Sequence, residues 1–139
     1  MSNKETTESP LDSMIIDQLR ALQRPGDPDM LQELADIYVE DAAKAMRTLH
    51  EALNAGDARR VYETAHTLKS SSASLGARRL AAVFEKLERM GRTAALDGAG
   101  DLLVTAEVEF TAACTALRAE SRRAEADRPR LAGGRLRAA

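Results

Sequence analysis

The amino-acid sequence predicts an all-α protein, an antiparallel up-down four-helix bundle with a short additional helix at its N-terminus. Aromatic residues make up only 3% of the 139 residues and Trp is absent, which disfavours a β-sandwich or barrel. Hydrophobic residues make up 44% and charged residues 30%, enough to bury a core and solvate a surface. Every apolar stripe has helical spacing, and none alternates like a strand. The length suits one domain of Ala- and Leu-rich helices.

The first predicted helix is short. Residues 1–11 are expected to form a disordered tail, because they are polar and hold no apolar run. Asp12 or Ser13 then provides an N-cap for a helix that runs to about Gln23. The Arg-Pro-Gly segment that follows ends it.

The second predicted helix is long. Asp27 is the expected N-cap, with Pro28 at the first helical position, where its missing N–H costs nothing. The helix runs to about Ala55, and Gly56 ends it. Its apolar stripe consists of Leu31, Leu34, Tyr38, Ala42, Ala45, Leu49 and Ala52. Such a stripe predicts a helix packed on a core along its whole length.

Three further helices complete the predicted bundle. Asp57 caps the third, which continues to about Leu75 before a glycine. The fourth covers residues 78–93, a glycine-containing linker follows, and the fifth covers residues 101–118. The short connections predict that neighbouring helices run antiparallel.

Charge is distributed unevenly along the chain. The formal net charge is −2, but residues 118–139 contain seven Arg and three acidic residues, so residues 1–117 are acidic. The folded domain is therefore expected to cover residues 12–118, followed by an Arg-rich flexible tail, 119–139. The body has no basic stripe and the tail no aromatic residue to stack on a base, so we expect no nucleic-acid partner.

Other patterns exclude several classes of protein. The single cysteine, Cys114, excludes an internal disulfide and a Cys-based zinc cage; it falls on an apolar stripe, where we expect it to be buried. No apolar run approaches the roughly 20 residues that span a bilayer, and the first ten residues lack the apolar region of a secretory signal. No Walker A or kinase-type ATP motif is present. We expect a cytoplasmic protein without membrane association or autokinase activity.

One histidine of the third helix is predicted to point outward. With about 100° per residue, one direction, the expected core face, collects Val61, Ala65, Leu68, Ser72 and Leu75. His66 points about 140° away from that direction. Its neighbours one or two turns along the helix are Tyr62, Lys69, Ser70 and Ala73. The sequence therefore places an imidazole on the outside of a rigid helix, beside a cation and small residues.

This pattern favours reversible phosphoryl transfer. A neutral imidazole is a good nucleophile near neutral pH, and Lys69 can offset the charge of an incoming phosphoryl group. Ser70 and Ala73 leave room for the active-site loops of a partner. Serine hydrolysis is disfavoured, because no acidic residue lies on this face of the helix to orient the ring of His66.

The second histidine serves as an internal comparison. His50 also projects away from its apolar stripe, but Leu53 stands at the position where a cation would be needed. We expect His50 to be an ordinary surface residue. The two histidines lie on different predicted helices without metal-ligand spacing, so we expect no metal and no cofactor.

Residues 66–77, HTLKSSSASLGA, resemble the signature of the histidine-containing phosphotransfer (HPt) domain family. The similarity extends to the helices on both sides and covers roughly residues 12–117. It implies a four-helix bundle in which His66 accepts a phosphoryl group from the aspartate of one receiver domain and passes it to another. It implies that Lys69 is the charge partner and that Glu88, on the neighbouring helix, steadies the histidine. Ser70 departs from the family, which usually has Gly there, and removes some clearance.

The resemblance also implies the partners. These are response-regulator receiver domains and a hybrid sensor histidine kinase, with Mg²⁺ on the receiver rather than on this chain. We expect the protein to be a monomer. Its expected partner surface includes one exposed apolar residue of the first helix, Ile15 or Ile16. The other members of this surface are Arg59, Tyr62, His66, Lys69, Ser70 and Ala73. Two alternatives stay open. One is an HPt-like module that binds a receiver or kinase without transfer, and the other is a structural bundle that binds through its basic tail.

Overall fold

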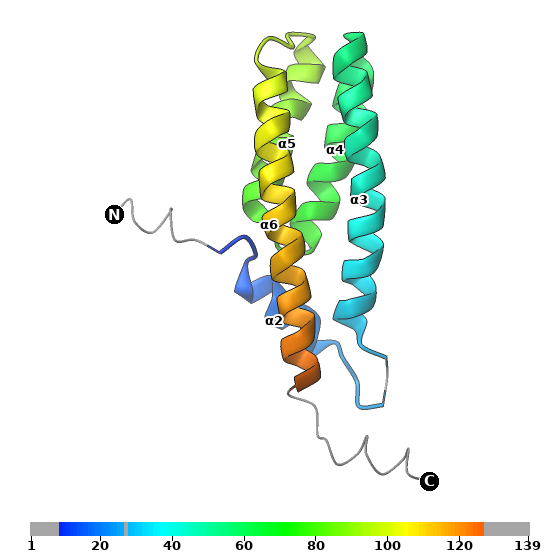
Figure 1. Cartoon of the computed structure of the whole chain (residues 1–139), viewed down its shortest axis with the longest axis vertical. Coiled ribbons are helices and arrows are strands. Elements are labelled where there is room, and N and C mark those ends of the chain that lie inside the picture. The colour runs from blue at the N-terminus through cyan, green and yellow to red at the C-terminus, as the bar shows by residue number, and fades with distance from the viewer. Residues whose placement is uncertain (1–8, 27, 127–139) are drawn as a thin grey trace, which may run out of the picture.

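The computed structural model describes residues 9–26 and 28–126, with side chains as far as residue 122. Within these ranges it contains five helices and no strand (Figure 1). The helices are α2 (Ser13–Ala21), α3 (Met30–Ala55), α4 (Ala58–Ser74), α5 (Arg78–Thr93) and α6 (Ala99–Ala126). The prediction of an all-α chain is confirmed for this part of the protein.

The four long helices lie side by side, and each reverses the direction of the one before it (Figure 1). α3 packs on α4, α4 on α5, α5 on α6, and α6 again on α3. The α4–α5 contact is the most extensive of these. This cyclic arrangement encloses the core and holds α4 and α5 against each other along their length.

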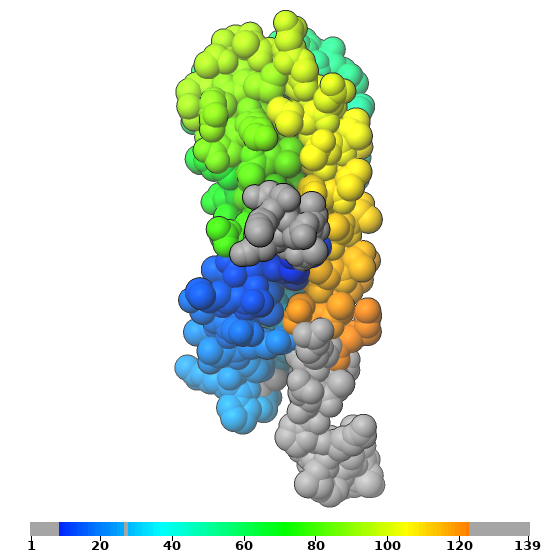
Figure 2. Space-filling view, turned by 90° about the vertical axis from the view of Figure 1, so that its left-hand side faces the viewer, coloured from blue at the N-terminus to red at the C-terminus, as the bar shows by residue number. Residues whose placement is uncertain are grey.

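The short helix α2 covers one end of the α4–α5 pair. α3 and α6 have 26 and 28 residues, whereas α4 and α5 have 17 and 16, so the longer pair extends past the shorter one. Figure 2 shows α2, in blue, directly below the green α4–α5 segment and beside α6. The backbone N–H of Asp12 donates to the carbonyl of Gly76, 2.7 Å away, and Arg20 pairs with Glu120 of α6 at 2.6 Å. The first contact fixes the start of α2 to the turn that follows α4, and the second fixes its end to α6.

The ordered structure begins earlier than predicted. Leu11 is only 5% exposed and belongs to the core, and its N–H donates to the Ser9 hydroxyl. The prediction of a disordered tail over residues 1–11 is therefore wrong for Leu11, while residues 1–8 lie outside the described ranges. Asp12 is the N-cap of α2, as one of the two expected choices, and the helix ends at Ala21 rather than near residue 23.

Caps fix the ends of the long helices. Asp57 accepts a hydrogen bond from the N–H of Arg60 and caps α4, and Gly56 ends α3 in the left-handed conformation, both as predicted. The N-cap of α3 is Asp29, which accepts from the N–H of Gln32. The expected cap, Asp27, lies outside the described residues. Pro28 therefore precedes the cap instead of occupying the first helical position.

The last helix is longer than predicted. α6 covers Ala99–Ala126, whereas the sequence suggested 101–118 followed by a flexible tail over 119–139. Glu120 pairs with Arg20 of α2, and Ser121 is only 3% exposed. The domain boundary at 118 is therefore wrong, because the next eight residues are helical and two of them pack on the protein. Residues 127–139 lie outside the described ranges.

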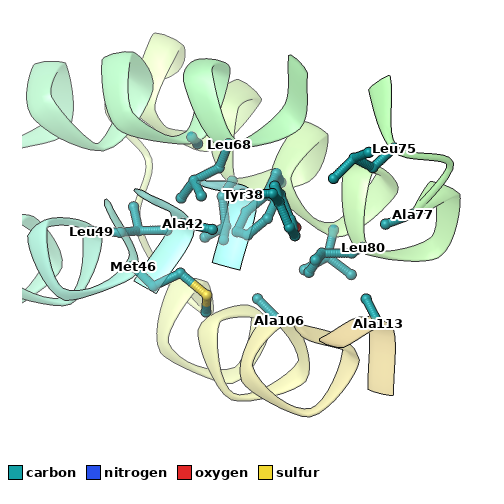
Figure 3. Packing of buried hydrophobic residues seen from close by; sticks show 14 of the residues in the cluster. Tyr38, Ala42, Met46, Leu49, Leu68, Leu75, Ala77, Leu80, Ala106 and Ala113 are labelled. Atoms are coloured by element: carbon teal, nitrogen blue, oxygen red, sulfur yellow. The ribbon is translucent and has the colours of Figure 1, made fainter. Parts of the chain in front are cut away.

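The core lies between the four long helices (Figure 3). Each helix contributes one stripe at helical spacing, as the sequence predicts. Figure 3 shows these side chains pointing toward one another between the ribbons, and the largest of the fully buried ones is Phe84 of α5. Cys114 is buried, as expected, and burial raises the pKa of its thiol. The labelled members are Tyr38, Ala42, Met46, Leu49, Leu68, Leu75, Ala77, Leu80, Ala106 and Ala113.

One polar pair lies inside this core. The hydroxyl groups of Tyr38 on α3 and Ser72 on α4 lie 2.8 Å apart and share a hydrogen bond. Tyr38 is 5% exposed and Ser72 fully buried, so each hydroxyl satisfies the other. Burial raises the pKa of Tyr38 to about 12. The pair links α3 to α4 on the face opposite to His66.

In the part of the chain that the structure describes, no helix is both long and apolar enough to cross a bilayer.

Candidate functional site

His66 lies on the outer face of α4, as the helical wheel predicts. The buried residues of α4 are Val61, Ala65, Leu68 and Ser72, all on the opposite face. The side chain of His66 is 56% exposed, so another protein can reach the imidazole. The rigidity of the site comes from the stripe behind it, since α4 is fixed by its buried face.

A buried carboxylate from the next helix orients the imidazole. Glu88 of α5 is only 3% exposed, and its Oε2 lies 3.0 Å from Nδ1 of His66. We expected no orienting acid on the His66 face of α4, and the acid that orients the ring comes instead from α5. The structure thus brings together His66 and Glu88, which the family resemblance had paired.

Two cations hold the same carboxylate. Nζ of Lys69 lies 2.6 Å from Oε1 of Glu88, and Nη2 of Arg92 lies 3.5 Å from its Oε2. Lys69 is 32% exposed and Arg92 59% exposed, so both cations stand between the carboxylate and solvent. A buried acid is tolerated when it is paired in this way. Lys69 therefore contacts Glu88 directly, rather than standing alone beside the imidazole.

The electrostatics of the carboxylate determine the protonation of the ring. The hydrogen bond from Lys69 holds the pKa of Glu88 below its ordinary value, with burial opposing it and the hydrogen bond to His66 reinforcing it. At neutral pH the carboxylate is ionised and can only accept hydrogen bonds. Nδ1 of His66 must therefore carry the proton, and a neutral ring presents the Nε2 lone pair.

An aromatic side chain and a second cation flank the imidazole. The ring of Tyr62, one turn earlier on α4, stacks on His66 with centroids 6.0 Å apart and an angle of 22°. The guanidinium of Arg92 lies 5.7 Å from the centroid of Tyr62. Tyr62 was predicted to lie beside His66, whereas Arg92 was not among the predicted site residues. The available signal was the i, i+4 spacing of Arg92 from Glu88 on one helix.

An open groove of about 640 Å³ runs from His66 between α4 and α5. Ser70 and Ala73 are exposed on its α4 side, as predicted, and Arg78 adds a cation at its far end. The remaining lining is small or polar: Lys69, Ser74, Ala81, Ala82 and Glu85. The groove therefore leaves open space next to the imidazole.

Two predicted contact residues do not line this groove. Arg59 is exposed on α4 and forms an ion pair with Glu63, 3.0 Å away. Ile15 is half-buried, with its Cβ close to Gly76 at the end of α4, and Ile16 is 2% exposed. The expectation that one of them is the exposed apolar residue of the first helix is wrong for Ile16. The residue of that helix that exposes most apolar surface near its start is Met14, at 65%.

His50 differs from His66 in its surroundings. It is exposed on α3, beside a separate groove between α3 and α6. Over residues 9–26 and 28–126, no three His, Cys, Asp or Glu side chains are arranged to hold a metal ion. His66 is thus the histidine that has an ordered carboxylate partner.

Comparison with known proteins places this geometry in a family. The Hpt domain model matches residues 33–120, more than half of the chain. Histidine-containing phosphotransfer protein 2 of Arabidopsis thaliana is 28% identical over 103 residues, which cover 72% of this chain and 66% of that protein. Histidine-containing phosphotransfer protein 5 of the same plant is 36% identical over 66 residues, covering 45% of this chain and 42% of that protein.

A fungal protein and a bacterial crystal structure are also similar to this chain. Multistep phosphorelay regulator 1 of Schizosaccharomyces pombe is 28% identical over 88 residues, covering 63% of this chain and 30% of that protein. The match thus spans less than two thirds of the length of each of these three relatives. The crystal structure of histidine-containing phosphotransfer protein B (HptB) from Pseudomonas aeruginosa PAO1 superposes with a TM-score of 0.72 and 34% identity, covering 81% of this chain and 95% of that one. The chain therefore belongs to the Hpt domain family.

Proposed function

We propose that this chain is a histidine phosphotransfer protein, and that His66 accepts a phosphoryl group from the aspartate of one receiver domain and passes it to another. The observation that carries the proposal is an exposed imidazole whose Nδ1 lies 3.0 Å from a buried carboxylate. Relatives named as phosphotransfer proteins and as a phosphorelay regulator support it.

The bundle supplies a rigid platform for this reaction. We infer that α3, α4, α5 and α6 form an antiparallel up-down four-helix bundle, supported by their cyclic contacts and alternating directions. α4 and α5 carry both the imidazole and its partner carboxylate, so the relative placement of two packed helices fixes the site. Phosphoryl transfer depends mainly on such positioning and on electrostatics.

The transfer step uses the Nε2 lone pair of His66. Nε2 attacks the phosphorus of an aspartyl phosphate on the partner, a P–N bond forms, and the P–O bond to the aspartate breaks. The leaving carboxylate keeps the electron pair of the broken bond. Positive charge develops on the ring, and the ionised Glu88, hydrogen-bonded to Nδ1–H, stabilises it. The reverse sequence of bond changes delivers the phosphoryl group to the next receiver.

Lys69 and the groove fit the same reaction. The Lys69 ammonium, one turn from His66 on α4, pairs with Glu88 and keeps it ionised. The groove beyond Ser70 and Ala73 is the proposed seat for the loops of the receiver. We propose that a hybrid sensor histidine kinase supplies one receiver, and that the chain acts in the cytoplasm as a monomer. The phosphoryl group then comes from these partners and not from ATP.

The proposal is tested with a receiver domain carrying a labelled aspartyl phosphate. On mixing, the chain should gain one phosphoryl group that is acid-labile and base-stable. His66→Gln should abolish the label, and His50→Gln, the matched control, should keep it. ATP alone should give no label. Persistent labelling of His66→Gln would overturn the assignment, and receiver binding without any transfer would instead identify a non-transferring interaction module.

A further inference from the structure

Gly91 lies at a point where the backbones of α4 and α5 come unusually close. A Cβ built on Gly91 would lie 2.5 Å from the backbone N of Tyr62, and 2.8 Å from both the Tyr62 Cα and the Ala58 carbonyl oxygen. All three are backbone atoms of α4, which cannot move aside as a flexible side chain can. Only a residue without a Cβ permits this approach.

Backbone freedom does not explain this glycine. Gly91 lies inside α5 and is buried; the helix ends two residues later at Thr93, and its C-cap Ala94 is in the left-handed conformation. The positive φ values in the described chain belong to Ala94 and to four other glycines, Gly26, Gly56, Gly76 and Gly98. Glycine is unfavourable in a helix interior. A gain in packing at this position must therefore offset that cost.

The close approach lies one turn from the proposed phosphoacceptor. Gly91 follows Glu88 by three residues on α5, so both face α4. Tyr62 precedes His66 by four residues on α4. The Gly91–Tyr62 backbone contact and the Glu88–His66 hydrogen bond are thus successive contacts along the same helix pair. Both contacts depend on how closely α5 approaches α4.

We propose that Gly91 is a positioning residue for phosphotransfer, setting the spacing of α4 and α5 so that the Glu88 carboxylate holds Nδ1–H of His66. This inference rests on the function proposed for His66. An Ala side chain would have to retreat by about 0.9 Å to reach ordinary contact with the Tyr62 backbone. If α5 carried that shift to Glu88, the present 3.0 Å contact would exceed the length of a good hydrogen bond.

The test measures the tautomer of His66 by ¹⁵N NMR of the imidazole in the folded protein, without any receiver. Gly91→Ala should lose the Nδ1–H tautomer and populate Nε2–H, which removes the nucleophilic lone pair. Gly100→Ala is the matched control, because Gly100 is also helical but has open space around its Cβ position. If Gly91→Ala keeps the same tautomer as the wild type and Gly100→Ala, the proposal is wrong.

Transfer kinetics provide a second readout. Gly91→Ala should lower the maximal transfer rate by about tenfold at an unchanged half-saturating receiver concentration, because the groove keeps its lining. In the Glu88→Ala background, which has no acceptor for Nδ1–H, Gly91→Ala should have no further effect on the tautomer. A purely structural role predicts instead that Gly91→Ala lowers the melting temperature and leaves tautomer and rate unchanged, which would overturn the proposal.

A second variant keeps the test decisive if Gly91→Ala does not fold. Glu88→Asp retracts the carboxylate by one methylene group while Gly91 stays in place. The proposal predicts the same loss of the Nδ1–H tautomer, and an unchanged tautomer would contradict it. The two failures give different results. If the proposed function is wrong, the wild-type chain gains no phosphoryl label from the receiver. If only this inference is wrong, the wild-type chain is labelled but the tautomer of His66 does not change in the variants.

Discussion

Oε2 of Glu88 lies 3.0 Å from Nδ1 of His66, although the two residues are 22 positions apart and belong to different helices. The carboxylate is buried and the imidazole is exposed, so the acid is fixed while the ring faces solvent. A buried, ionised acceptor fixes the tautomer of an exposed nucleophile. The following predictions test this relationship and the fold that holds it.

Replacing Glu88 by Gln should make stability less dependent on acid pH. The hydrogen bond from Lys69 lowers the folded-state pKa of Glu88 below 4.5, so the unfolded chain binds this proton more readily. The Glu88 contribution to the free energy of unfolding is therefore present above pH 4.5 and is lost as the pH falls through the folded-state pKa. Urea unfolding of both proteins should show that the wild-type advantage narrows over this acid range.

The same substitution separates charge from hydrogen bonding. The Gln amide oxygen can still accept from Nδ1–H, so the tautomer of His66 should be retained. The lost negative charge should slow transfer roughly tenfold, because it no longer stabilises the developing imidazolium. An unchanged rate, or a stability difference that does not vary with acid pH, would show that Glu88 acts only as a packing residue.

Replacing Lys69 by Ala should slow transfer without unfolding the protein. Lys69 lies off the core and contacts the buried Glu88 at 2.6 Å, so its loss removes one of the cations that hold that carboxylate. We expect a roughly tenfold slower transfer and a loss of about 1–2 kcal/mol in the free energy of unfolding. Lys86→Ala, at an exposed position on the other side of α5, is the control for both assays. A wild-type rate in Lys69→Ala would remove this residue from the site.

Replacing Tyr38 by Phe should change stability at alkaline pH. The unfolded Tyr38 ionises near pH 10, whereas the folded one stays protonated until about pH 12. Its contribution to the free energy of unfolding is therefore fully present below pH 10 and is lost as the pH rises toward 12, by up to about 3 kcal/mol. Tyr38→Phe has no ionisable hydroxyl, so its free energy of unfolding should not fall over this pH range. At neutral pH the variant should be less stable by about 1 kcal/mol, because it lacks the hydrogen bond with Ser72. Denaturant unfolding between these pH values checks the difference, and a pH-independent difference would contradict the burial of the hydroxyl.

Two truncations test the corrected boundary of α6. Ending the chain after residue 126 should leave stability and transfer unchanged, because it keeps all of α6 as the structure describes it. Ending it after residue 118 removes Glu120, leaves the half-buried Arg20 without its partner, and removes the buried Ser121. We expect that deletion to lower the free energy of unfolding by about 1–3 kcal/mol.

Thermal or urea unfolding of the two truncated proteins provides the comparison. Equal stability would mean that residues 119–126 contribute nothing to the fold. Loss of partner binding in the chain that ends at residue 126, with stability retained, would favour the alternative in which the basic tail is the binding element.

Much of the helix pattern could be predicted because its signals are local. Asp57 and Gly56 mark the α3–α4 turn, and the bounds of α5, Arg78–Thr93, agree with the prediction. The cap of α3 was missed because two aspartates flank Pro28 and both have capping side chains. The end of α6 was missed because its Arg-rich composition was interpreted as a tail, although the next helix breaker is Pro129.

The site could be predicted only in part, because its second half is tertiary. The outward direction of His66 follows from periodicity within α4 alone. The burial of Glu88 could not be read from a charged residue on a helix, since it depends on how closely α5 approaches α4. The same holds for Arg92, whose contacts with Glu88 and Tyr62 follow from that packing. A glycine inside a helix, Gly91, was a local signal that α5 comes close to another helix, and the prediction made no use of it.

The most direct measurement is ¹⁵N–³¹P NMR of the ¹⁵N-labelled chain after phosphorylation by a receiver. The geometry predicts that phosphorus couples to Nε2 of His66. It also predicts that Nδ1 keeps its proton and donates it in a hydrogen bond to Glu88. Coupling of phosphorus to Nδ1 or to another residue would contradict the claim that Nε2 of His66 is the phosphoacceptor. The absence of any bound phosphorus after mixing with phosphorylated receivers would contradict it as well.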